Sequence, residues 1–133
     1  MAKLLIVDDE APILVVMEAL FRAEGFEVVT TQDGREAARL LATRAFDLMI
    51  TDVRMRPLDG FDLLRVARRP RIRLPVIMVT AFESLETREK ALRMGAVDLL
   101  RKPFDSEGLV ALVRKSLRQR RPGRRARARR KGL

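Results

Sequence analysis

Five short apolar runs alternate along this chain with segments of helical periodicity, and this alternation limits the folds that it can adopt. The runs begin near residues 4, 27, 47, 75 and 98. Most of them are continuous rather than alternating in polarity, which is typical of strands buried on both faces of a parallel sheet. The pattern therefore predicts an α/β fold in which helices cover both sides of a parallel sheet.

Local signals place helices between these runs. Pro12 lies in the first turn of the first helix, and Gly25 follows its end. Apolar residues of this helix recur at i, i+3, i+4, i+7 and i+8 and are expected to face the core: Ile13, Val16, Met17, Leu20 and Phe21. The other four helices each begin after a residue that suits a helix N-cap: Asp33, Asp59, Ser84, and either Asp105 or Ser106.

The net charge of +10 comes from the C-terminal end of the chain. Residues 114–133 contain 11 Lys and Arg and no Asp or Glu, whereas residues 1–113 contain 17 Lys and Arg against 18 Asp and Glu. We therefore predict one domain over residues 1–118, followed by a basic, disordered tail over residues 119–133. If the protein binds nucleic acid, this tail is the segment expected to do so. The tail has no aromatic residues to stack on bases, so the favoured interpretation is a solvated tail.

Missing residue types and motifs exclude several kinds of chemistry. The chain has no cysteine for disulfides or thiol catalysis, and no histidine, the commonest general base and zinc ligand. No P-loop or dinucleotide-binding glycine motif follows any strand, which argues against a nucleotide-binding enzyme. No apolar run approaches the ~20 residues that span a bilayer, and no signal peptide is evident. The default expectation is a cytoplasmic protein with no membrane partner.

Polar residues stand where four of the predicted strands end. Asp8 and Asp9 follow the first run, Asp52 the third, Thr80 the fourth and Lys102 the fifth. Right-handed crossovers bring the carboxyl ends of parallel strands to one edge of the sheet, where ligands bind. Taken singly, each residue is explained as well by capping, a turn or a solvated surface. Together, the carboxylates suit a divalent cation, and the hydroxyl and ammonium suit a phosphoryl group.

Longer motifs around these residues resemble the receiver domain of two-component response regulators, over residues 3 to about 118. The matching stretches are Leu5-Ile6-Val7-Asp8-Asp9-Glu10, Asp47-Leu48-Met49-Ile50-Thr51-Asp52-Val53-Arg54-Met55, Leu58-Asp59-Gly60, Val79-Thr80-Ala81 and Lys102-Pro103-Phe104. The block over residues 81–87 is similar to receivers of the nitrogen-regulator group. The resemblance implies a doubly wound, flavodoxin-like (βα)5 sandwich whose five parallel strands lie in the order 2-1-3-4-5.

The resemblance also implies a Mg²⁺-dependent phosphoacceptor. Asp52 would accept a phosphoryl group from a sensor histidine kinase or a phosphotransfer protein, and the domain would catalyse only its own phosphorylation and dephosphorylation. The groups implied to hold Mg²⁺ are Asp8, Asp9, Asp52 and the backbone carbonyl of Arg54. The groups implied to contact the phosphoryl oxygens are the side chains of Thr80 and Lys102 and the backbone amide of Ala81.

Phosphorylation is then expected to switch the binding of an output protein that the sequence does not identify. The fourth helix, fifth strand and fifth helix form a common homodimer surface in the family. Two positions depart from the family pattern: Leu99 stands where an aromatic residue commonly changes rotamer, and Arg56-Pro57 places proline one residue later than usual. Arg54 and Phe82 flank the site at positions that tune dephosphorylation in the family, and we expect Phe82 to restrict the access of water.

Two other functions compete with this interpretation. A Mg²⁺-dependent phosphohydrolase would also use a strand-end aspartate such as Asp52, but it needs a general acid nearby, and Val53 and Arg54 follow Asp52 instead. The other alternative is a nucleic-acid-binding protein that acts through its basic tail and keeps the receiver fold only as a scaffold.

Overall fold

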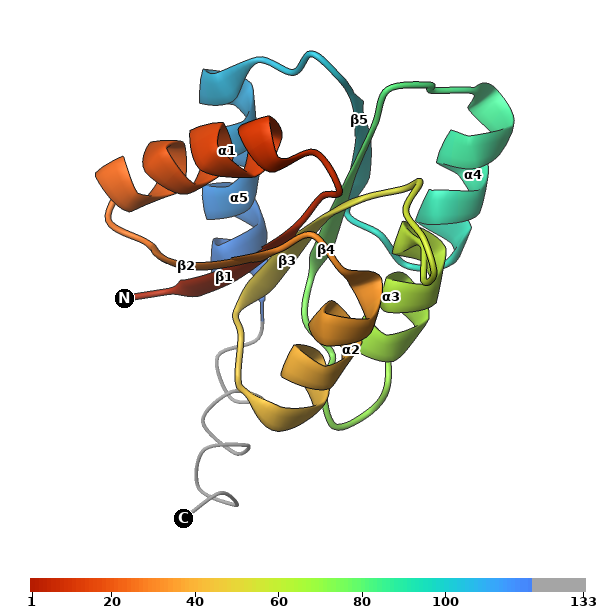
Figure 1. Ribbon diagram of the computed structural model, residues 1–133, viewed down its shortest axis with the longest axis horizontal. Helices are drawn as coiled ribbons and strands as arrows, with labels where there is room; N and C mark the ends of the chain where they lie inside the picture. The colour runs from red at the N-terminus through yellow and green to blue at the C-terminus, as the bar shows by residue number, and fades with distance from the viewer. Residues whose placement is uncertain (121–133) are drawn as a thin grey trace.

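A five-stranded parallel sheet forms the middle layer of the computed structural model, which describes residues 1–120 (Figure 1). The strands are β1 (Lys3–Val7), β2 (Glu27–Thr31), β3 (Leu48–Asp52), β4 (Val76–Thr80) and β5 (Asp98–Arg101). They lie in the order β2-β1-β3-β4-β5, and every neighbouring pair is parallel. The predicted α/β class and strand order are confirmed.

Helices cover both faces of this sheet (Figure 1). Two of them, α1 (Ala11–Ala23) and α5 (Ser106–Gln119), lie on one face, and α2 (Gly34–Thr43), α3 (Gly60–Ala67) and α4 (Leu85–Arg93) lie on the other. Successive residues of a strand point to opposite faces. Leu4 and Ile6 of β1 therefore pack in the α1–α5 layer, and Leu5 and Val7 pack in the α2–α3–α4 layer. Burial on both faces explains why the strands are continuously apolar.

Side-chain caps begin the four later helices where the sequence predicts them. Each capping oxygen accepts a hydrogen bond from a backbone N–H in the first turn, which satisfies a donor that has no partner within the helix. The capping residues are Asp33, Asp59, Ser84 and Asp105. Asp59 and Asp62 form a reciprocal capping box at the start of α3, next to the end of β3.

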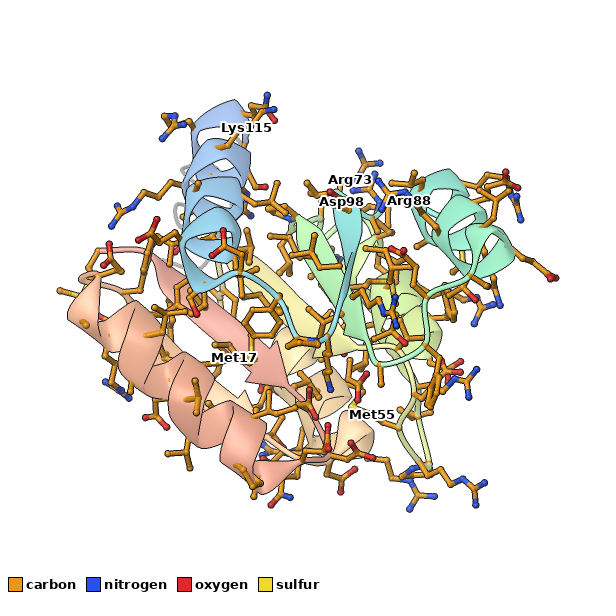
Figure 2. All side chains as sticks on the ribbon, turned by 90° about the horizontal axis from the view of Figure 1, so that it is seen from above. Met17, Met55, Arg73, Arg88, Asp98 and Lys115 are labelled. Carbon is orange, nitrogen blue, oxygen red and sulfur yellow. The ribbon has the colours of Figure 1, made fainter. Side chains whose placement is uncertain are left out.

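The inward face of α1 differs from the prediction at one residue. Met17 and Phe21 are buried as expected, and Figure 2 labels Met17 where α1 packs over the sheet. Val16, however, is 60% exposed, and Leu14 is buried in its place. Leu14 precedes Met17 by three residues and Phe21 by seven, so it lies on the same helix face as both, whereas Val16 lies at the margin of that face. The structure turns the longer Leu14 side chain into the core.

Gly60 allows α3 to start directly against the end of β3. A Cβ atom at Gly60 would collide with the carbonyl oxygen of Asp52. The Gly60 N–H also donates to the carbonyl of Val53 at 2.8 Å. A side chain at this position would push α3 away from the strand end that carries Asp52.

At the amino end of the sheet, a buried aspartate connects three segments of the chain. Asp47, which is 2% exposed, accepts a hydrogen bond of 2.7 Å from the backbone N–H of Lys3. Arg120, the residue after α5, donates to the Asp47 carbonyl at 2.9 Å and to the Phe46 carbonyl at 3.3 Å. Its guanidinium also lies 3.5 Å from the Asp47 carboxylate. These contacts fix the end of α5 against the start of β3.

Most of the tail predicted over residues 119–133 lies outside the described residues, since α5 runs to Gln119 and Arg120 is its C-cap residue. None of the helices within residues 1–120 has the length and the hydrophobicity that a membrane span requires.

The outer edge of β5 is covered by an arginine from α4. Arg88 lies beside Asp98 in Figure 2, and its guanidinium is 2.9 Å from the Asp98 carboxylate. The same guanidinium donates to the backbone carbonyl of Leu99 at 2.9 Å. Asp98 in turn accepts from the backbone N–H of Leu99 at 2.7 Å. Both backbone polar groups of Leu99 are therefore engaged by side chains.

Candidate acidic site at the carboxyl edge of the sheet

The structure brings together three of the predicted site residues around one ammonium group. Asp8 follows β1, Asp52 ends β3 and Lys102 follows β5. The Lys102 Nζ atom lies 2.7 Å from Asp8 Oδ2 and 3.4 Å from Asp52 Oδ2. Asp8 is fully buried, and Asp52 is 5% exposed. A single lysine therefore bridges two carboxylates that are almost entirely removed from water.

Two further acids stand at the solvent side of this cluster. Asp9 and Glu10 are exposed, and one carboxylate oxygen from each of Asp8, Asp9 and Glu10 falls within a group 4.8 Å across. Glu10 Oε2 is also 3.1 Å from Lys102 Nζ. The sequence alone predicts no role for Glu10. Its position next to Asp8 and Asp9 in the sequence is the one signal that could have indicated a role at the site. The contact with Lys102 depends on tertiary structure.

Thr80, Ala81 and Arg54 lie at the same edge but make other contacts. Thr80 ends β4 with 1% exposure, and its hydroxyl oxygen accepts a 3.1 Å hydrogen bond from the backbone N–H of Phe82. Ala81 is exposed in the loop that follows. The Arg54 guanidinium lies over the Phe82 ring, 5.3 Å from its centroid. Thr80 and Ala81 thus occupy the expected strand end, and Arg54 and Phe82 stack on each other at its rim.

Leu99, at the position where the family commonly has an aromatic residue, is 1% exposed and packs in the core on the α2–α3–α4 side. Leu99 is therefore part of the hydrophobic core in this structure.

Burial and crowding of like charges perturb the acid–base properties of the cluster. Burial, followed by the charge of Asp8, raises the pKa of Asp52 to about 6, although Lys102 opposes the shift. Burial also raises the pKa of Asp8 against the stabilising contact of Lys102. For Lys102, burial alone would lower the pKa, but the contacts with Asp8, Asp52 and Glu10 outweigh it and raise the pKa. The cluster holds more negative charge than one ammonium can balance.

This donor set fits a hard divalent cation. Magnesium prefers carboxylate and carbonyl oxygens, usually takes one or two carboxylates, and completes its coordination with water or phosphate oxygens. The oxygens of Asp8, Asp9 and Asp52 are of this kind, and the shortage of positive charge in the cluster favours an added cation.

The chain resembles known proteins over most of its length. A model of the response regulator receiver domain matches residues 4–114. Over 114 residues the chain is 38% identical to the transcriptional regulatory protein ZraR of Escherichia coli O157:H7, covering 86% of this chain and 26% of that protein. It is 36% identical over 112 residues to the DNA-binding transcriptional regulator NtrC of Escherichia coli K12, covering 84% and 24%. The expected likeness to nitrogen-regulator receivers is thus confirmed.

A solved structure with the same fold carries a metal ion. It is the receiver domain of the sensor histidine kinase PA1611 from Pseudomonas aeruginosa PAO1, with magnesium coordinated in its active site cleft. The TM-score is 0.79 at 30% identity, over 87% of this chain and 97% of that one. The chain spans about a quarter of the length of the curated relatives named above. It belongs to the family of response regulator receiver domains, the phosphoaccepting signalling domains of two-component systems.

Proposed function

We propose that Asp52 is the phosphoacceptor of this receiver domain and that the reaction depends on Mg²⁺. The observation that carries the proposal is the placement of Lys102 Nζ between the buried carboxylates of Asp8 and Asp52 at the carboxyl edge of the sheet. An aspartate buried in this way has a fixed position, and Lys102 places a positive charge beside it for an incoming phosphoryl dianion.

Charge balance explains the need for a cation. A phosphoryl group that approaches Asp52 meets the carboxylates of Asp8 and Asp9 as well, and repulsion from them opposes the reaction. Lys102 offsets part of this repulsion. Bound Mg²⁺ would supply the remaining positive charge. The residues that would hold it are Asp8, Asp9, Asp52 and the backbone carbonyl of Arg54.

The transfer itself asks little covalent chemistry of the protein. A carboxylate oxygen of Asp52 attacks phosphorus, and the bond between phosphorus and the donor breaks. The bonding electron pair leaves with the donor's imidazole nitrogen when the donor is a phosphohistidine, and that nitrogen then takes up a proton from solvent. No histidine of the receiver takes part, which agrees with a chain that has none.

Three donors would receive the phosphoryl oxygens once Asp52 is modified. Lys102 already faces the Asp52 carboxylate. The Ala81 amide and the Thr80 hydroxyl lie at the end of the neighbouring strand β4. Because the Thr80 hydroxyl is engaged with the backbone of Phe82, its turn toward the phosphoryl group would release that contact and move the β4–α4 loop. This movement would alter the surface offered to an output protein.

The phosphodonor is a sensor histidine kinase or a phosphotransfer protein, and the domain catalyses only its own phosphorylation and dephosphorylation. A homodimer through α4, β5 and α5 and a location in the cytoplasm remain predictions from the sequence.

Incubation with acetyl phosphate and MgCl₂, followed by intact mass measurement, tests the assignment. The wild-type chain should gain one phosphoryl group, and chelation of Mg²⁺ should abolish the gain. Asp52→Asn should gain none, because an amide is a poor nucleophile toward phosphorus.

Asp33→Asn provides a matched control at an exposed aspartate, since asparagine caps a helix as well as aspartate does. This variant should be phosphorylated like the wild type. A phosphoryl group on Asp52→Asn, or equal labelling with and without Mg²⁺, would contradict the proposal.

A further inference from the structure

Glu10 contacts both members of the buried Asp8–Lys102 pair, although phosphoryl transfer as described above gives it no part. Its backbone N–H donates to Asp8 Oδ1 at 2.9 Å. Its side-chain Oε2 atom accepts a hydrogen bond of 3.1 Å from Lys102 Nζ. The Glu10 side chain is 57% exposed, whereas that of Lys102 is 10% exposed. Glu10 therefore reaches from the surface to the ammonium that lies between Asp8 and Asp52.

The Glu10 side chain takes this position instead of capping α1. Glu10 is the N-cap residue of α1, and its side chain forms no capping hydrogen bond. The N-cap residues of the other four helices within residues 1–120 all cap through their side chains. A side-chain oxygen at an N-cap normally satisfies a first-turn N–H that has no partner within the helix. The direction of the Glu10 side chain is thus explained by Lys102 and not by the needs of α1.

The Lys102 ammonium is divided among three carboxylates. Nζ lies 2.7 Å from Asp8, 3.1 Å from Glu10 and 3.4 Å from Asp52. Hydrogen bonds from an ammonium to a carboxylate are usually about 2.7 to 2.9 Å long, so the contact with Asp52 is the weakest. An ammonium has as many N–H donors as there are carboxylates here. A phosphoryl oxygen can therefore gain a donor from Lys102 only when one carboxylate gives it up.

Under the proposed function, two of these carboxylates are engaged elsewhere. Asp8 is one of the residues that would hold Mg²⁺, and Asp52 would carry the phosphoryl group. Glu10 has neither task. It is the carboxylate that remains to compete with the phosphoryl oxygens for the ammonium.

We propose, resting on the function proposed above, that Glu10 is a positioning residue that holds the Lys102 ammonium toward the rim of the site and away from a phosphoryl group on Asp52. Glu10 acts through Lys102 and does not itself contact the phosphoryl group. Its contact with Lys102 lowers both the rate of phosphorylation and the stability of the phosphorylated form. Glu10 is then a brake on the site.

The exposure of Glu10 sets the size of this effect. An ion pair with an exposed partner changes an equilibrium constant by up to about fivefold, because water solvates the carboxylate when the pair opens. A buried carboxylate such as Asp8 would compete far more strongly, since it would be left without solvent. Glu10 can therefore slow the reaction without preventing it.

Glu10→Gln tests the proposal, because glutamine has nearly the same shape as glutamate but no charge. The second-order rate of phosphorylation by acetyl phosphate, measured by intact mass at saturating Mg²⁺, should rise about three- to fivefold. Trifluoroberyllate mimics a phosphoryl group without any transfer step, and its affinity should rise by the same factor, measured from the shift in melting temperature. Because salt screens exposed charges, the gain in both measurements should fall below about twofold when salt is raised from about 0.05 to 0.5 M.

Two further variants separate the contact with Lys102 from the charge of Glu10. Glu10→Asp keeps the charge but shortens the side chain, and an aspartate at an N-cap bonds to the first turn of the helix. It should therefore behave like Glu10→Gln. Glu107→Gln removes the same charge from an exposed acid in the first turn of α5, at the same edge of the sheet, and should stay within about 1.5-fold of wild type. Wild-type behaviour of Glu10→Asp would mean that only charge at the rim matters, and this would overturn the proposal.

A double-mutant cycle shows whether Glu10 acts through Lys102. In the Lys102→Gln background, Glu10→Gln should change the phosphorylation rate by less than about 1.5-fold. A full gain in this background would contradict the proposal, and so would a rate in the single variant that is equal to or below that of wild type.

The Mg²⁺ requirement decides between this role and a direct role in metal binding, since a Glu10 oxygen lies in the same group as those of Asp8 and Asp9. Glu10→Gln should need the same Mg²⁺ concentration as wild type, and a higher requirement would assign Glu10 to the metal and refute the brake. Labelling that depends on Asp52 but is unaffected by Glu10→Gln would refute the role of Glu10 alone. Equal labelling of wild type and Asp52→Asn would refute the proposed function together with this inference.

Discussion

Asp47 and Asp52 lie at opposite ends of the same strand, and both are buried, but their surroundings differ in charge balance. Asp47 precedes β3 and receives a backbone N–H from Lys3 and the guanidinium of Arg120. Asp52 ends β3 and shares a single ammonium with Asp8. A buried carboxylate that has its own donors holds segments together, whereas carboxylates that share one donor are short of positive charge. This shortage is what a cation and a phosphoryl group would relieve.

The largest expected effect comes from removing the shared ammonium. Lys102→Gln should slow phosphorylation by acetyl phosphate about 100-fold, because one positioned donor to the phosphoryl oxygens is lost. Arg120→Gln, at the other end of the strand, should leave this rate within about twofold of wild type. The measurement is the rate of mass gain under equal Mg²⁺. Similar slowing of phosphorylation in both variants would contradict the proposed difference between the two ends of β3.

The second prediction compares the stability effects of the two aspartates. Folding raises the pKa of Asp52 from 3.8 to about 6, so the folded state binds the proton more tightly than the unfolded chain. This group therefore lowers the free energy of unfolding as pH rises through about 4 to 6. In EDTA at about pH 7, Asp52→Asn should stabilise the protein by about 1 to 3 kcal/mol, and Asp47→Asn should destabilise it by about 1 to 3 kcal/mol.

Urea unfolding at several pH values measures both changes. The gain from Asp52→Asn should disappear below about pH 4, where the wild-type carboxyl is protonated in both states. Excess Mg²⁺ should also remove the gain, since the wild type then has a cation to balance its carboxylates. A variant with the same stability as wild type at all pH values in EDTA would show that the crowding of charge at this end costs nothing.

The smallest expected effect is on the lifetime of the phosphoryl group. Phe82 is 67% exposed and stacks with Arg54 at the rim of the site. Phe82→Glu would remove this apolar cover and bring a carboxylate that can orient water, so dephosphorylation should accelerate a few-fold. Leu85→Glu is the matched control, because Leu85 is a similarly exposed apolar residue at the start of α4. Equal decay rates for Phe82→Glu and wild type would exclude this role of Phe82.

Much of the fold could be predicted because its signals are local. Asp33 and Ser84 cap helices through bonds that span two or three residues, so the sequence alone contains both partners. The continuous apolar strands indicated burial on both faces, and a parallel sheet then brings Asp8, Asp52 and Lys102 to one edge.

What the sequence could not predict depends on distant contacts. The prediction that Val16 faces the core was wrong for a different reason, because the spacing of Leu14 from Met17 and Phe21 already places Leu14 on the inward face. The contact of Glu10 with Lys102 spans 92 positions, and that of Asp47 with Arg120 spans 73. No local pattern joins such residues, because only the packed sheet brings them together.

The engagement of Leu99 by Arg88 and Asp98 has a consequence for how molecules of this protein meet. An exposed edge strand with unpaired backbone N–H and C=O groups is a template onto which another chain can add a strand, and such addition leads to aggregation. On β5 the N–H and C=O of Leu99 are already occupied by charged side chains. A second molecule would have to displace an ion pair before it could extend the sheet there, so this flank is protected against strand-by-strand growth.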